Sequence, residues 1–239
     1  MYNGPGYSNN AGRQVPSHVG QAPPQVPMSQ PQAVFRYGEQ AVWSTQGFAA
    51  GATLANQQFR LFTTALNATG QGFTTLALSL AETNLKVNGQ LPQSFAFDCY
   101  GVALQPMHFT STSQDGVTMA QPAVTAAQIG DIINVVNNGV LSWDFTQSGF
   151  AIAPAMLIGA GGGAFGAIST TQNATDRGHM NNGAGTFWLY NQYPIALPGL
   201  VQFAIVLQFG SRAPVIGASS ALALRVCLLG YYKALVEIG

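Results

Sequence analysis

Residues 201–209 read VQFAIVLQF and give the clearest indication of the fold class of this 239-residue chain. Every second side chain of the stretch is large and apolar, and two glutamines lie between them. Such strict alternation predicts a β-strand, because successive side chains of a strand point to opposite faces. Residues 221–229 read ALALRVCLL and repeat the pattern, with leucines and a valine on one face and Arg225 and Cys227 on the other. We therefore expect both segments to be core strands.

Similar short runs recur from Ala33 onward and predict further strands at 58–66, 73–80, 94–104 and 140–145. Clusters of Gly, Pro, Asn and Ser bound most of these runs, which is typical of a sandwich or a barrel. In the run 94–104 the alternation predicts one face made of Phe95, Phe97 and Cys99, and an opposite face made of Asp98, Tyr100 and Val102. Many of the runs are apolar on both faces, which suits sheets that another subunit covers.

One segment follows helical spacing instead. Its apolar side chains recur at three- and four-residue intervals after Thr125, and Asn138-Gly139 ends the pattern; they are Ile129, Ile132, Ile133 and Val136. A single short helix among many strands excludes a doubly wound α/β fold, in which strands and helices alternate. The expected fold is all-β.

Charge is scarce. The chain has eight basic and eight acidic residues, a formal net charge of zero, and 7% charged residues, against about 25% in a typical soluble domain. A monomer usually stays dispersed through a charged surface, so we expect partners to cover most of this one. Neutrality also argues against direct nucleic-acid binding, which needs clustered Lys and Arg.

Residues 1–32 form a separate compositional zone that holds six of the thirteen prolines and one charged side chain, Arg13. The zone has no apolar period, so it cannot form a core of its own. Two interpretations stay open: a tail without a structural role, or an extended arm that becomes ordered only against neighbouring subunits. We expect an arm at 1–32 and one β-sandwich domain at 33–239.

The stretch 150–168 contains no polar side chain and is nearly long enough to span a bilayer. It also contains five glycines and Pro154, which are poor material for a membrane helix. We therefore expect a buried strand followed by a glycine-rich loop.

Residues that could carry chemistry are few. Cys99 and Cys227 lie in apolar runs without metal spacing, so we expect buried free thiols. The glycine run 161–166 matches a dinucleotide-binding pattern but lacks the strand, the helix and the spaced acid that this pattern requires. Asp176, Arg177 and His179 share one polar loop and are interpreted as a solvated turn; no catalytic, cofactor-binding or metal-ligating residue is assigned, and no enzyme activity is expected.

The order of segments from Ala33 to Gly239 resembles the jelly-roll major capsid proteins of tailless icosahedral phages, especially those that enclose a membrane. The resemblance lies in the order of its parts: TNL at 83–85, GQLP at 89–92, the strand 94–102, the helix, VLSWDF at 140–145, and the final strands 200–209 and 221–229. It implies a jelly-roll sandwich with one short helix and an extended N-terminal arm. The length after the arm favours a single roll over a double one.

The resemblance also implies a virion location and partners. These are other copies of the chain in a capsomer, with a trimer as the expected form, and the neighbours of that capsomer in the lattice. Other virion proteins and an internal lipid membrane are further implied partners, without direct contact to nucleic acid. An alternative of another class is a self-associating cell-surface appendage, or an adhesin or lectin-like β-sandwich. That alternative needs an export route, and the N-terminal residues show no secretory signal pattern.

Overall fold

The computed structural model describes residues 34–73, 77–109, 126–145, 148–159, 187–190, 193–212, 215–217 and 221–236. In these ranges the chain forms nine strands, one α-helix and one turn of 3-10 helix. In chain order they are β1 (Val34–Phe48), β2 (Gln58–Leu61), β3 (Phe95–Phe109), α1 (Ala126–Asn138), β4 (Gly139–Phe145), β5 (Ser148–Pro154), η1 (Ala155–Leu157), β6 (Trp188–Leu189), β7 (Ile195–Leu197), β8 (Phe203–Phe209) and β9 (Ala221–Val236).

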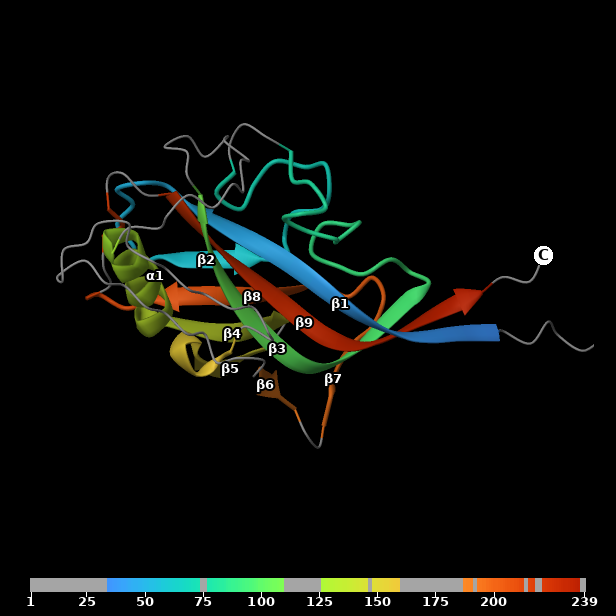
Figure 1. Ribbon diagram of the computed structural model, residues 1–239. Coiled ribbons are helices and arrows are strands. Elements are labelled where there is room, and N and C mark those ends of the chain that lie inside the picture. The colour runs from blue at the N-terminus through green and yellow to red at the C-terminus, as the bar shows by residue number, and fades with distance from the viewer. Residues whose placement is uncertain are drawn as a thin grey trace, which may run out of the picture.

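The strands form two antiparallel sheets (Figure 1). One sheet has the order β1-β9-β3-β6, with β7 also paired to β3, and the other has the order β2-β8-β4-β5. The first described strand therefore lies beside the last, and the second lies beside the second-last. The predicted all-β sandwich is confirmed.

A single core lies between the two sheets. It contains Phe97 from β3 and Leu228 from β9 on one side, and Trp143 from β4 and Ile205 from β8 on the other. The inner faces predicted for the segments 201–209 and 221–229 are confirmed in β8 and β9. Their alternating large apolar residues are buried, namely Phe203, Ile205, Leu207, Phe209, Leu222, Leu224, Val226 and Leu228. The period-two alternation correctly predicted which side chains face the core, because neither alternating run is interrupted by a bulge.

Strand β3 departs from the predicted alternation. Its register against β9 shifts between Cys99 and Gly101, so that Tyr100 is an extra residue in a β-bulge. The bulge turns Val102 into the core together with Cys99, although the sequence placed these two side chains on opposite faces. The extra residue moves the core side chains from odd to even positions, and the prediction failed beyond it because it assumed unbroken alternation over 94–104.

Two predicted strands differ from those observed. The strand expected at 58–66 ends at Leu61, because Phe62 has a φ of 67° and turns the chain out of the sheet. The strand expected at 73–80 is wrong: its described residues, Phe73 and 77–80, lie in a loop. Phe73 and Leu78 nevertheless share a small apolar cluster with Ala223 of β9. Leu80, two residues after Leu78 and on the same face of the predicted alternation, is 60% exposed, so the alternation in this run marks neither a strand nor a buried face.

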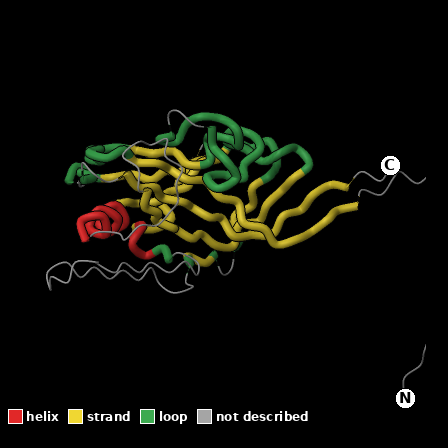
Figure 2. Tube along the Cα trace, turned by 45° about the horizontal axis from the view of Figure 1, so that its top comes forward, coloured by secondary structure: helices red, strands yellow, loops and turns green. Residues whose placement is uncertain are grey.

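Strands β1 and β9, with 15 and 16 residues, are long and extend beyond the sandwich, as Figures 1 and 2 show. We call the paired segments 34–40 and 230–236 the ribbon. Val34 pairs with Val236, so both ends of the described chain lie at the tip of the ribbon. The ribbon lies at the end of the molecule opposite to α1 (Figure 2).

Other expectations fall partly outside the described residues. The strand expected at the start of 150–168 corresponds to β5, but the expected burial is wrong: β5 lies at the edge of its sheet, and of its described side chains only Ile152 and Ala153 are buried. The glycine run 161–166 is not described. Residues 1–32 also lie outside the described ranges, so the division into an arm and a domain stays a prediction. Among the described helices, none has the length and hydropathy needed to cross a bilayer.

Candidate interaction surfaces

The residues that the sequence singled out for chemistry do not assemble a reactive site in the described structure. Cys99 and Cys227 are both free, Cys99 buried and Cys227 half-buried. Burial raises the pKa of Cys99 to about 12 and that of Cys227 to about 11, so both stay protonated near neutral pH. Asp176, Arg177 and His179 lie outside the described residues. Within the described ranges, no three His, Cys, Asp or Glu side chains come together as metal ligands.

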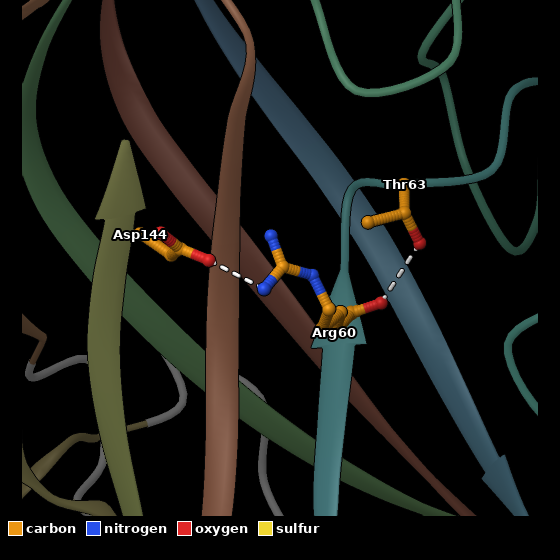
Figure 3. A network of polar contacts seen from close by, with 3 residues as sticks. All are labelled: Arg60, Thr63 and Asp144. Carbon is orange, nitrogen blue, oxygen red and sulfur yellow. Dashed lines mark hydrogen bonds and ion pairs between the residues drawn. The ribbon is translucent and has the colours of Figure 1, made fainter. Parts of the chain in front are cut away.

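An ion pair spans the outer face of the smaller sheet (Figure 3). The Arg60 guanidinium of β2 lies 2.5 Å from the Asp144 carboxylate of β4, and the two strands flank β8. Thr63 donates its hydroxyl hydrogen to the Arg60 carbonyl oxygen at 3.0 Å, where the chain leaves β2. The side chains of Arg60 and Asp144 are 57% and 32% exposed, so the pair contributes roughly 0–1 kcal/mol to stability. Because each charge neutralises the other, this cluster has no free charge to offer a ligand.

The edge of β1 is closed along its second half by the loop that follows β2. Asn84 accepts the Trp43 N–H at 2.9 Å and donates to the Ala41 carbonyl at 2.8 Å. Further along, the Gly47 N–H donates to the Gln71 carbonyl at 2.8 Å. Side chains and backbone of this loop thus occupy the place of a neighbouring strand, which protects an edge from pairing with other chains.

The first half of β1 has an open edge among the described residues. Here β1 is the outermost strand of its sheet. The groups that point outward at Ala41, Trp43 and Gly47 all belong to odd-numbered residues, and β1 pairs with β9 without a register shift. By the period of two, the N–H and C=O groups of Phe35, Tyr37 and Glu39 also point to this edge.

The outer face of the ribbon is aromatic and exposed. Phe35 is 43% exposed and Tyr37 is 66% exposed. The Lys233 ammonium lies 4.1 Å from the centroid of the Phe35 ring and 5.8 Å from that of Tyr37. Tyr231, also exposed, lies 5.2 Å from Tyr100 between ring centroids. Exposed aromatic side chains in contact with one cation are typical of an interaction surface.

A groove of about 290 Å³ lies under the opposite face of the ribbon. Its walls include Phe95 and Tyr232, whose ring centroids are 6.2 Å apart, together with Leu91. Arg36 and Lys86 add two cationic side chains to the lining.

Sequence reasoning missed the ribbon and both of its faces. The signal was available as FRYGE at 35–39, a short run that contains two aromatic and two charged residues. The run was not recognised as a strand because neither of its faces is continuously apolar. Its position became visible only through the pairing with β9.

Comparison of the chain with protein-family models, with curated proteins and with solved structures found no match.

Proposed function

We propose that this chain is a structural subunit of an icosahedral virion shell and that its sandwich is a single jelly roll. The strand order carries the proposal. Strands β6 and β7 both pair with β3 and can count as one interrupted strand. The chain then has eight strands, ordered 1-8-3-6 in one sheet and 2-7-4-5 in the other. This is the order of a jelly roll, an architecture common among viral capsid proteins.

Strand order alone does not select a shell protein, because lectin domains and cupins use the same architecture. The charge content favours self-assembly over a soluble binding module. Only 7% of the residues in the chain are charged, so electrostatic repulsion between copies is weak. The ribbon adds an open strand edge and exposed aromatic side chains, which are features that natural monomers usually avoid.

The proposed partners follow from this function. Copies of the same chain are the first, in capsomers and between capsomers, with residues 1–32 as an exchanged arm. Other virion proteins and an internal lipid membrane are further partners, as the resemblance to membrane-containing phages implies. Direct contact with nucleic acid is not proposed, since the net charge is zero.

Electron microscopy of the full-length chain, purified and concentrated, tests the proposal. Closed shells or uniform capsomers are expected, and sedimentation in physiological salt should show oligomers at micromolar concentration. Assembly should depend weakly on salt, because few ion pairs are present to be screened. Fibres would instead favour the surface-appendage alternative, and a stable monomer would overturn self-assembly altogether.

A further inference from the structure

We propose that two copies of this chain join through the open edges of their β1 strands, in an antiparallel pair with Tyr37 opposite the partner's Tyr37. The two ribbons would then form one continuous sheet across a two-fold axis. This inference rests on the self-association in the proposed function and names the surface and the partner, which is a second copy of the chain.

The backbone provides the first argument. Phe35, Tyr37 and Glu39 direct their N–H and C=O groups to the open edge, and none of them is a proline. An exposed edge of this kind is a template for another strand. A two-fold axis perpendicular to the sheet pairs such a strand with its own copy, because an isologous contact uses the same patch twice.

The closed half of β1 determines the register. When Tyr37 faces the partner's Tyr37, Phe35 faces the partner's Glu39, and all three outward residues of each strand are paired. Sliding one strand by two residues in one direction would bring Phe35 opposite the partner's Ala41, whose carbonyl already accepts a hydrogen bond from Asn84. Sliding it the other way would place Glu39 opposite a residue that precedes the described strand. The register centred on Tyr37 therefore uses the open edge completely.

The side chains agree with this register on the outer face. Lys233 lies 4.1 Å above the Phe35 ring, and the partner's Glu39 would be directly opposite Phe35. Opposite residues of an antiparallel pair have Cβ atoms about 5 Å apart. The Glu39 carboxylate of each copy would thus lie within reach of the Lys233 ammonium of the other copy, and two reciprocal ion pairs would border the aromatic side chains.

The inner face agrees as well. Arg36 would lie opposite the partner's Gly38. A Cβ atom at Gly38 would be 2.5 Å from the Tyr232 ring, so no side chain fits at this position without a shift of that ring. The absence of a side chain leaves room for the arginine of the other copy.

Cysteine cross-linking of the full-length chain tests the register. Opposite residues in a hydrogen-bonded antiparallel pair have Cα atoms about 5.5 Å apart, which is within disulfide range. A Tyr37→Cys variant should therefore form a covalent dimer under mild oxidation. A Phe35→Cys variant alone should not, because the two positions 35 would be roughly 13 Å apart along the strands. A mixture of Phe35→Cys and Glu39→Cys chains should cross-link. Cys99 and Cys227 contribute little background, since burial keeps both protonated.

A backbone variant tests the hydrogen bonds independently. Tyr37→Pro removes one N–H from the open edge and leaves the bonds between β1 and β9 in place, whereas Tyr37→Thr removes the same ring but keeps the N–H. Loss of the dimer in sedimentation for Tyr37→Pro, with retention for Tyr37→Thr, is the expected result. Equal association of both variants would overturn strand pairing. Circular dichroism and thermal unfolding establish that both are folded.

The outcomes separate this inference from the proposed function. Closed shells without a cross-link at position 37 would overturn the strand pairing and leave the shell function standing. A specific cross-link in a protein that never forms shells would support the pairing and contradict the shell function. If the Phe35→Cys variant and the Tyr37→Cys variant each formed a covalent dimer on its own, the two strands would be in contact without a fixed register. That result would overturn the pairing.

Discussion

The Asn84 side chain replaces a neighbouring strand at Trp43. Its Oδ1 accepts the Trp43 N–H at 2.9 Å, and its Nδ2 donates to the carbonyl of Ala41, two residues before Trp43, at 2.8 Å. A single amide thereby satisfies one donor and one acceptor on the edge of β1. The position of this residue sets the boundary between the closed and the open part of the edge.

Replacing Asn84 with leucine should destabilise the fold and lengthen the open edge. The Trp43 N–H and the Ala41 carbonyl would both lose their partner, at a cost of about 1–3 kcal/mol. Chemical denaturation measures this loss, and light scattering should show more association than in the parent chain. Asn137→Leu, at an exposed position of α1, is the matched control and should change stability little. Unchanged stability in Asn84→Leu would show that the amide does not hold this edge.

Stability should fall with pH above about 9 because of Cys99. Burial raises the pKa of this thiol from its ordinary value of 9.0 to about 12. Between these values the unfolded chain releases the proton while the folded chain retains it, so the free energy of unfolding decreases as the pH rises. The decrease from this group is about 1.4 kcal/mol per pH unit.

Denaturation at a series of pH values from 7 to 11, on the parent chain and on Cys99→Ser, isolates this contribution. The serine hydroxyl does not titrate in this range, so the variant should have a shallower slope above pH 9. Parallel slopes for the two proteins would show that Cys99 titrates equally in the folded and the unfolded chain. Native-state labelling with a thiol reagent should also be slow at both cysteines and fast after unfolding.

The sequence identified those strands whose inner side chains are uniformly apolar. Strand β8 and the part of β9 at 221–229 could be predicted, because Ile205 and Val226 belong to unbroken alternating runs that face one core. The continuation of β9 to Val236 was not predicted. The bulge at Tyr100 and the left-handed turn at Phe62 could not, because both depend on contacts with segments distant in the sequence. The pattern identified these runs as buried, but did not show where a strand ends or changes face.

The interaction surface was harder to predict than the core. Phe35 and Tyr37 are exposed aromatic residues in a strand that also contains Arg36 and Glu39, and a hydrophobic pattern does not mark such a segment. What makes it a candidate is the change at Ala41 from an open to a closed edge. That change depends on Asn84, more than forty residues away, and no local pattern contains it.

Removing the Tyr190 hydroxyl should destabilise the sandwich by about 1–3 kcal/mol. This hydroxyl accepts the indole N–H of Trp143 at 2.8 Å, and Trp143 is 1% exposed. In Tyr190→Phe the buried N–H would lose its acceptor while the ring is kept. Thermal or chemical unfolding measures the cost. Tyr231→Phe, at a residue that is 49% exposed, removes an equivalent hydroxyl and should have little effect. Equal effects of the two variants would contradict a specific role for the buried hydrogen bond.

Deleting residues 1–32 should leave the β-sandwich folded and should weaken or abolish assembly. Every buried side chain of the described core lies after this segment, beginning with Val42, so the deletion removes none of the core. The segment has six prolines, which lower the conformational entropy lost when an extended chain is laid onto a neighbouring subunit. Circular dichroism and thermal unfolding of the truncated chain should match the full-length protein, while microscopy should show few or no shells. Normal shells from the truncated chain would mean that residues 1–32 have no structural role, and an unfolded product would mean that they belong to the domain.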